Sequence, residues 1–483
     1  MLTVHDRLRD ALSRLENLVA KALTASDMES RRWAETLLPL VTQAKLIARQ
    51  YGYVVTNPPY MGGKGLNPAL KTFLKDNYAD VKSDLFSAFV VRNFEMSEDN
   101  AQLGFMSPFV WMFISSYEKL RDYLIDEKTI TSLIQLEYSG FDGATVPICT
   151  YTLANSHLQN LKGSFIRLSD FRGADNQAPK TLEAIRNKDC GWYYTAPASD
   201  FKKIPGSPIA YWASSNTIKA FENFDPVCKN YTVSPGIRTG KDEWFLRFWF
   251  EVSTDNIQFN LSSASQMDIN NKWFPLHKGG DYRKWHGNCE HIIDLKNEGE
   301  SIKDKSPDFR LRDKKFYFKQ YVSWSRISSS DIAFRYYPKG VLFSDAGPGV
   351  FSEDESLWLM AALNSPIGNH FLRLINPTLN YQKKDIELVP YVQRPSDEAC
   401  SKLEELFKLS KFDWDASETS WDFLGSPLIN NEYKVENAYE KLTVEYKSTT
   451  QKIKSIEEEY NSFFITALGL QEELCASPHP LDH

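Results

Sequence analysis

The sequence predicts an α/β protein in which a sheet with helices across its connections is followed by an α+β region and a long coiled-coil helix. Between residues 51 and 160, short apolar runs alternate with amphipathic helical runs. After about residue 155, Pro and Gly become frequent, and segments such as DEWFLRFWFEV are rich in aromatic and β-branched residues. After residue 432, apolar positions recur at alternating steps of four and three residues, which is a heptad pattern.

Taken in order, residues 1–50 predict two helices, because Leu8, Leu12 and Leu15 recur at helical spacing and a second periodic run ends at LIARQYG. Gly52 breaks the helix, and the apolar residues after it predict a strand. Further helices are expected at 71–78, 84–96 and 116–127, and further strands at 103–106, 130–136 and 147–153. These patterns divide the chain into a helical lead-in (1–50), a sheet region (51–160), a region with long loops (161–395) and an acidic helical tail (396–483). The long helix is expected to fold back on its own chain or to pair with another.

Composition favours a globular protein of several domains: 42% of the 483 residues are hydrophobic and 25% are charged. No apolar run reaches the length of about 18 residues that spans a membrane, and the first 20 residues lack a signal-peptide pattern. We therefore expect a cytoplasmic protein with no membrane partner. The six cysteines are scattered and form no C-x-x-C pair, so neither a disulfide framework nor a four-cysteine zinc site is expected.

Charge is unevenly distributed along the chain, whose net charge is -7. Residues 272–339 contain fifteen Lys and Arg against nine Asp and Glu, whereas residues 396–483 contain eight against eighteen. A basic middle segment is typical of a DNA-facing surface, and an uneven but solvated surface explains it equally well. The candidate contacts to DNA phosphates or guanine edges are Lys241, Arg283, Lys284, Lys319, Arg326 and Arg335.

The motif with the clearest chemistry is Asn57-Pro58-Pro59-Tyr60, directly after the predicted strand. The exocyclic amine of adenine is a poor nucleophile because its lone pair is delocalised into the ring, and two acceptors for its hydrogens draw it toward tetrahedral geometry. The Asn57 side-chain oxygen and the Pro58 carbonyl can be those acceptors, since the prolines stiffen the backbone that presents them. Tyr60 offers a face on which an extruded base can stack. A simple turn at the end of the strand is the alternative.

The segment YGYVVTNPPYMGGKG resembles the catalytic motif of the amino-group DNA methyltransferases that use S-adenosylmethionine. The later segments SDLFSAFV, LGFMSPFVWMF and FDGATVPICTYTL resemble the ordered segments of the adenine-specific enzymes. Within this group the sequence resembles the large PglX methyltransferases of BREX phage-defence systems and related fused restriction-modification enzymes. The resemblance runs from about residue 44 to residue 474 and implies a Rossmann-like class I methyltransferase sheet followed by a target-recognition region that binds double-stranded DNA.

The resemblance also assigns roles to residues. Asn57 and Pro58 would hold the target amine, Tyr60 would stack the adenine, and Phe141 would flank the extruded base, although a core position explains Phe141 equally well. Asp84, Leu85 and Phe86 match a segment that lies beside the cofactor in such enzymes. A helix start with Asp near its N-terminus is the alternative for this segment.

One departure from the family concerns the cofactor. The family has a glycine-containing turn for S-adenosylmethionine before the catalytic strand, and residues 1–50 contain no glycine. The resemblance therefore implies a carboxyl-terminal portion of such an enzyme with an incomplete cofactor site. Its sheet would expose an edge for a partner, either the missing amino-terminal half or another defence-system subunit.

Other motifs have simpler explanations. The segment HKGGDYRKWHGNCEH does not match a zinc pattern, so no metal is expected. No nuclease motif is visible. Three functions remain open: a site-specific adenine methyltransferase of a phage-defence or restriction-modification system, active when a cofactor half is supplied; a catalytically inactive module that binds DNA and partners; and an inert remnant.

Overall fold

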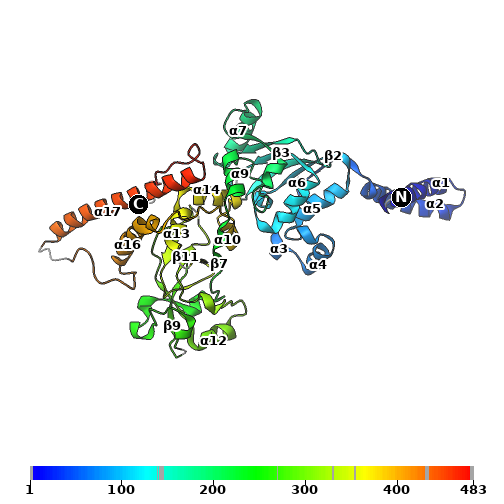
Figure 1. Ribbon diagram of the computed structural model, residues 1–483. Helices are drawn as coiled ribbons and strands as arrows, with labels where there is room; N and C mark the ends of the chain where they lie inside the picture. Colours follow the sequence, from blue (N-terminus) through cyan, green and yellow to red (C-terminus); the bar gives the residue numbers. More distant parts are fainter. Residues whose placement is uncertain are drawn as a thin grey trace. The chain divides into compact units, whose positions relative to one another are not determined.

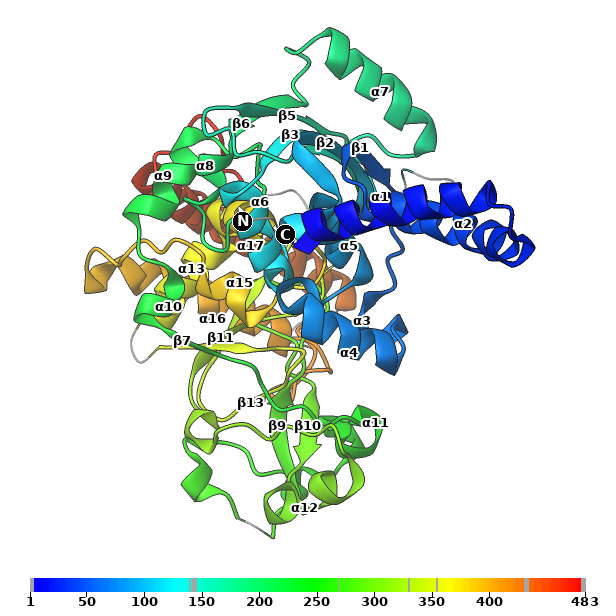
Figure 2. The same ribbon diagram turned by 90° about the vertical axis from the view of Figure 1, so that its right-hand side faces the viewer.

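The computed structural model describes residues 4–138, 140, 146–268, 270–328, 331–352, 355–429 and 434–478. The chain folds into two compact units (Figures 1 and 2). The first comprises Met1–Lys202 and Gly206–Trp212, and the second comprises Lys203–Pro205 and Ala213–His483. The short segment Lys203–Pro205 therefore belongs to the second unit although residues of the first lie on both sides of it.

The first unit is built on a six-stranded sheet with the order β1-β2-β4-β3-β5-β6. β1 is parallel to β2, β4 is antiparallel to both β2 and β3, β5 is parallel to β3, and β6 is antiparallel to β5. The carboxyl ends of β1, β2, β3 and β5 therefore lie at the same edge of the sheet. The strands are β1 (Tyr51–Thr56), β2 (Ser97–Pro108), β3 (Thr129–Gln135), β4 (Ile148–Ala154), β5 (Lys162–Arg167) and β6 (Tyr193–Pro197).

Helices of the first unit have recognisable start signals. The carboxylate of Asp27 accepts hydrogen bonds from the first-turn amides of α2, and Asn67 does the same for α4, whose first residue is Pro68. α1 and α2 lie side by side around Val19, Ala34 and Val41 (Figure 1). The helices are α1 (Val4–Leu23), α2 (Met28–Ala48), α3 (Gly62–Gly65), α4 (Pro68–Asn77), α5 (Leu85–Glu95), α6 (Glu118–Asp126), α7 (Ala174–Arg186) and α8 (Ala198–Phe201).

The two faces of this sheet differ. Alternate residues of β1, β2 and β4, among them Val54, Leu103 and Tyr151, point into the main core with α5 and α6. On the opposite face, α7 packs over Ile134 and Ile166, but the side chains over β1 remain accessible: Tyr53 is 81% exposed and Val55 is 83% exposed. Parallel strands of α/β proteins are normally covered on both faces, so this apolar face of β1 lacks the usual cover within the described part of the chain.

The second unit is mixed α+β, with two four-stranded sheets. One has the order β13-β9-β10-β8 and the other β12-β11-β14-β7. The strands are β7 (Thr232–Ser234), β8 (Leu246–Phe248), β9 (Trp273–His277), β10 (His291–Asp294), β11 (Tyr321–Trp324), β12 (Phe334–Tyr337), β13 (Leu342–Phe343) and β14 (Gly349–Phe351). The helices are α9 (Ser215–Asn223), α10 (Val227–Asn230), α11 (Asp242–Phe245), α12 (Lys296–Lys305), α13 (Ser356–Asn364), α14 (Pro366–Ile375), α15 (Lys383–Glu387), α16 (Ser401–Asp415) and α17 (Val435–Ala467).

The heptad segment forms the 33-residue helix α17, visible in red in Figure 1. Its carboxyl-terminal half folds back on its own unit: Phe464 is buried, and the ring of Trp358 on α13 contacts Tyr460, Phe463 and Phe464. The amino-terminal half leaves Val435 and Tyr439 mostly exposed. The predicted helix is therefore present, whereas its pairing in a coiled coil stays a prediction.

Two features differ from the expected organisation. The sheet continues past residue 160, because β5 and β6 complete it, so the boundary expected at 160/161 falls inside the first unit. Residues 1–50 also belong to that unit. Among the described helices, none is both long and apolar enough to cross a membrane.

Candidate active site and DNA-facing surface

The tetrapeptide Asn57–Tyr60 follows the carboxyl end of β1 directly. Pro58 is buried and anchors the turn, whereas Asn57, Pro59 and Tyr60 are exposed. The Asn57 carboxamide makes no hydrogen bond with any residue that the structure describes. The turn therefore has a buried proline beside an accessible side-chain carboxamide and an accessible aromatic ring. Hydrogen bonding to an amine and stacking on a base require accessible groups of these two kinds.

Aromatic side chains line the same edge of the sheet. The register of β1 and β2 pairs Thr56 with Phe105, and the chain continues from β2 to Phe109, whose ring contacts Tyr138 edge-on at 5.4 Å. Tyr138 lies just after β3, and burial raises the pKa of its phenol. Phe141, the expected partner of the extruded base, lies outside the described residues, so its role stays a prediction.

Asp84 begins a helix, as the sequence suggested, and also makes contacts that the sequence did not predict. It is the N-cap of α5 and is 6% exposed. Its Oδ1 accepts hydrogen bonds from the amides of Leu85 at 2.6 Å and Met61 at 3.2 Å, and its Oδ2 accepts one from the amide of Gly62 at 2.9 Å. The carboxylate therefore connects the start of α5 to the residues that follow Tyr60. The N-cap was foreseeable from SDLF, but the link to Met61 and Gly62 carries no local sequence signal.

The residues matched to the cofactor do not form a site for S-adenosylmethionine. Phe86 is fully buried against Tyr117, at a ring distance of 5.4 Å, and the Asp84 carboxylate already accepts three backbone amides. The residues before β1 fold as α1 and α2 and supply no glycine turn at the carboxyl end of a strand. The described part of the chain therefore does not fit this cofactor, and only the half-buried Leu85 remains a candidate contact.

Four of the six basic residues expected to contact DNA have at least part of their side chain accessible. Lys319 is exposed, and the Lys241 ammonium lies 4.3 Å from the ring centroid of Trp244. Arg326 pairs with Asp345 at 2.7 Å and Arg283 pairs with Asp413 at 2.5 Å. Ion pairs at a protein surface are weak, so these arginines remain able to exchange a carboxylate for a phosphate.

The other two basic residues lie in the interior. The Lys284 side chain is only 8% exposed, and its ammonium lies 3.7 Å from the carboxylate of Glu457 on α17. Arg335 is 0% exposed and donates to the carbonyl of Arg283, the hydroxyl of Ser325 and the hydroxyl of Tyr337. Buried side chains that are bound in this way cannot reach a DNA phosphate in this structure, so we exclude both from the candidate DNA surface.

The histidines of HKGGDYRKWHGNCEH are packing residues here. His277 is fully buried with Nδ1 3.0 Å from the Ser323 hydroxyl, and His291 lies against the ring of Phe248. His286 packs edge-on against Phe407 at 5.3 Å, and Cys289 is buried. Within the described ranges, no group of three His, Cys, Asp or Glu side chains is placed to hold a metal ion.

Burial gives His286 a measurable effect on stability. Burial, followed by the nearby Lys411 ammonium, lowers the pKa of His286 from 6.5 to about 4. The unfolded chain therefore binds this proton more readily than the folded chain. The contribution of the neutral His286 to the free energy of unfolding is fully present above pH 6.5 and is lost as the pH falls toward 4. Between pH 7 and pH 4, we expect the free energy of unfolding of the His286→Phe variant to fall by about 3 kcal/mol less than that of the wild type. Urea unfolding across this range measures the difference.

The exposed His157 provides the control for this experiment. The His157→Phe variant removes one imidazole from the surface and should follow the wild-type curve. Parallel curves for His286→Phe and the wild type would contradict the role given to His286.

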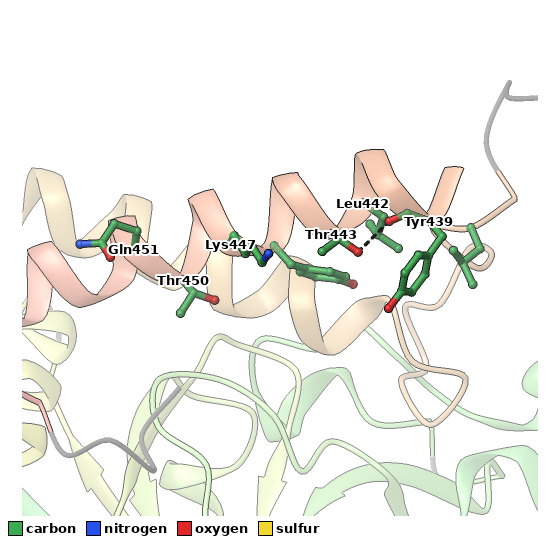
Figure 3. Close-up of a pocket in the computed structure, with 8 residues that line it drawn as sticks. Tyr439, Leu442, Thr443, Lys447, Thr450 and Gln451 are labelled. Atoms are coloured by element: carbon green, nitrogen blue, oxygen red, sulfur yellow. Dashed lines mark hydrogen bonds between the residues drawn. The ribbon is translucent and has the colours of Figure 1, made fainter. Parts of the chain in front are cut away.

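A surface groove of about 610 Å³ runs along the amino-terminal half of α17 (Figure 3). Tyr439, Leu442 and Tyr446 of the heptad seam line it, and the Thr443 hydroxyl beside them donates to the carbonyl of Tyr439 at 2.8 Å. None of the predicted catalytic residues lines this groove. It belongs to the second unit, whereas the candidate active site belongs to the first.

Comparison with known proteins finds relatives along nearly the whole chain. Residues 6–141 match the family Eco57I restriction-modification methylase. The chain is 35% identical over 476 residues to "Adenine-specific methyltransferase BrxX" of Escherichia coli O9:H4 (strain HS), covering 96% of this chain and 38% of that protein. It is 33% identical over 468 residues to "Adenine-specific methyltransferase PglX" of Lacticaseibacillus casei (strain Zhang), covering 93% of this chain and 38% of that protein.

A solved structure supports the fold. The Type IIL restriction-modification enzyme MmeI, determined in complex with DNA, superimposes with a TM-score of 0.51 at 12% identity, covering 87% of this chain and 54% of that chain. The chain spans about 38% of the length of the BrxX and PglX relatives. Over that span, the similarity covers both structural units, and nearly the whole chain is similar to a part of the BrxX and PglX adenine-specific methyltransferases.

Proposed function

We propose that this chain supplies the target-adenine side and the DNA-recognition region of a site-specific DNA adenine methyltransferase in a phage-defence or restriction-modification system. The observation that supports this most directly is the accessible Asn57 carboxamide, which has no hydrogen bond to any described residue, beside the buried Pro58 at the carboxyl end of β1. Ligand sites of α/β sheets are found at that end of the strands. BrxX and PglX, to which the chain is similar, are adenine-specific methyltransferases.

In this proposal the chain prepares the nucleophile. The Asn57 oxygen and the Pro58 carbonyl accept the two hydrogens of the adenine amine and draw its lone pair out of conjugation. The exposed Tyr60 ring stacks on the extruded base, which contributes about 1–3 kcal/mol and offsets an extrusion cost of a few kcal/mol. S-adenosylmethionine, the methyl donor that the family resemblance implies, would supply an electrophilic methyl group when bound by residues outside the described part of this chain.

The donor is bound by a second polypeptide segment in this proposal, because the described residues do not fit it. We propose that this segment adds a parallel strand beside β1 and covers the face that carries Tyr53 and Val55. β1 is an edge strand in the described sheet, and its outward apolar side chains are 81% and 83% exposed. An open edge with exposed apolar residues is a typical site for strand addition.

Substitutions on this face should separate docking from stability. In a Tyr53→Ser, Val55→Ser double variant, both changes fall on exposed side chains, so the free energy of unfolding should stay within about 0.5 kcal/mol of the wild type. Affinity for the donor-binding segment should fall at least about a hundredfold, because each side chain contributes about 1.5–3 kcal/mol when buried. Urea unfolding and calorimetric titration measure the two effects.

A matched control exists on α7, where Leu182 and Ile185 are 50% and 57% exposed. The Leu182→Ser, Ile185→Ser variant removes two exposed apolar side chains from the same unit but from another surface. It should bind the donor segment normally. Equal loss of affinity in both variants would refute docking at β1.

The proposed function is tested by complementation. The part of the BrxX relative that this chain does not cover is purified and mixed with the chain, and methyl transfer from labelled S-adenosylmethionine to duplex DNA is measured. The proposal requires transfer in the mixture and none from the BrxX segment alone. Absence of transfer from a mixture that forms a stable complex would reject it.

DNA binding without chemistry is the second candidate function. Lys241, Lys319, Arg283 and Arg326 in the second unit keep accessible charge. Binding to duplex DNA that weakens steeply with salt would support a recognition role even if no methyl transfer occurred. An inert remnant would bind neither DNA nor the donor segment.

A further inference from the structure

Asp84 makes contacts that neither a cofactor residue nor a simple helix cap requires. A capping residue needs only to accept an amide of its own helix, as Asp84 does from Leu85 at 2.6 Å. Its carboxylate also accepts the amides of Met61 and Gly62, which lie 23 and 22 residues earlier in the chain. These two amides come directly after the Asn57–Tyr60 tetrapeptide.

The backbone at Gly62 is shaped for this contact. Gly62 has φ of 65°, in the left-handed region, and no heavy atom lies within 4 Å of the position of an added Cβ. Glycine therefore serves the backbone conformation here, since there is space for a side chain. The turn brings the consecutive amides of Met61 and Gly62 toward one carboxylate.

Asp84 itself is held by the interior of the first unit. The Ser87 hydroxyl donates to the carbonyls of Asp84 and Val81, each at 2.7 Å. In the helix that follows, Phe86 and Val90 are fully buried. A continuous set of contacts thus runs from the core through α5 and the Asp84 carboxylate to the loop after Tyr60.

We propose that Asp84 is a positioning residue that fixes the loop carrying Asn57, Pro58 and Tyr60 to the amino terminus of α5. Its importance for methyl transfer rests on the proposed function. A misplacement of about 1 Å in a reacting geometry can lower a rate about a hundredfold. A site placed on a loop therefore needs a fixed support of this kind.

Two variants separate this role from helix capping. Asp84→Ser keeps a side-chain acceptor for the first turn of α5 but is too short to reach Met61 and Gly62, whereas Asp84→Ala loses both functions. Asp80→Asn is the control, because Asp80 lies on the adjacent surface, pairs with Lys119 and is largely exposed. All variants are made in the full chain.

The first measurement needs no enzymatic activity. Hydrogen exchange of the Met61 and Gly62 amides should accelerate on the order of tenfold or more in Asp84→Ser, because their bonds to a charged acceptor are lost. The amides of α5 should remain protected in this variant and become less protected in Asp84→Ala. Wild-type exchange at Met61 and Gly62 in Asp84→Ser would overturn the proposal.

The second measurement uses the complemented enzyme. Asp84→Ser should lower kcat by about ten- to a hundredfold and leave KM for DNA unchanged, since the loop is displaced but the DNA surface is intact. Unchanged kcat with faster amide exchange would overturn the catalytic part of the proposal. If the wild-type mixture transfers no methyl group, the proposed function fails, and the exchange result alone decides whether Asp84 holds the loop.

Discussion

Replacing Asn57 by alanine is expected to lower methyl transfer by the complemented enzyme about 10²- to 10³-fold. This is the usual effect of removing one preorganised hydrogen-bonding group that acts on the reacting atoms. The carboxamide is exposed and makes no hydrogen bond to the described residues, so its removal leaves no buried group unsatisfied. The free energy of unfolding and the affinity for DNA should therefore stay at their wild-type values. Single-turnover methylation, urea unfolding and DNA titration measure the three quantities.

Asn77 at the end of α4 provides the matched control for Asn57. It is also exposed, and among the described residues its side chain donates to one partner, the carbonyl of Phe73 in its own helix, at 3.0 Å. Asn77→Ala should retain full activity. Full activity of the Asn57→Ala variant would show that the assignment of the amine-binding oxygen is wrong.

Much of the sheet was predictable from sequence because its signals are local. The apolar run before Asn57, the helix start at Asp84, and the apolar runs of β2 and β3 each lie within one element. β5 and β6 were missed as members of this sheet, since their partners are decided by pairing across the chain: Phe165 pairs with Leu133 in β3 and with Tyr194 in β6. Nothing in either short run specifies that register.

In the candidate site, too, some features follow from local sequence and others depend on tertiary packing. The chemistry of Asn57–Tyr60 follows from residue types in a short stretch, but the contact of Asp84 with Gly62 depends on how α5 packs. A count of basic residues likewise contains no information on burial. Lys284 is held beside Glu457 and Trp285 donates to the same carboxylate at 2.5 Å, across 172 residues of sequence. A charge-rich segment can therefore include interior residues that only tertiary structure identifies.

Replacing Arg335 by methionine is expected to destabilise the second unit by about 3 kcal/mol or more. Methionine fills similar space but leaves the carbonyl of Arg283 and the hydroxyls of Ser325 and Tyr337 without their buried donor. Arg326→Met is the matched control nearby in the chain. The Arg326 side chain is 32% exposed and pairs with Asp345 at 2.7 Å, so this substitution should cost less than about 1 kcal/mol. Urea unfolding of the two variants measures the contrast.

Binding to DNA and the conservative substitution to lysine separate the two roles further. A residue that contacts a phosphate tolerates lysine. Its loss reduces the slope of the logarithm of the binding constant against the logarithm of the salt concentration by about one. Arg326 should behave in this way. Arg335 donates from Nε and from both terminal nitrogens to three different partners, and a lysine ammonium cannot span them. Arg335→Lys should therefore destabilise the unit although the charge is kept, with an unchanged salt dependence in the fraction that remains folded. A stable Arg335→Lys variant, or a stable Arg335→Met variant with weakened DNA binding, would contradict the interior role and would support a contact between Arg335 and DNA.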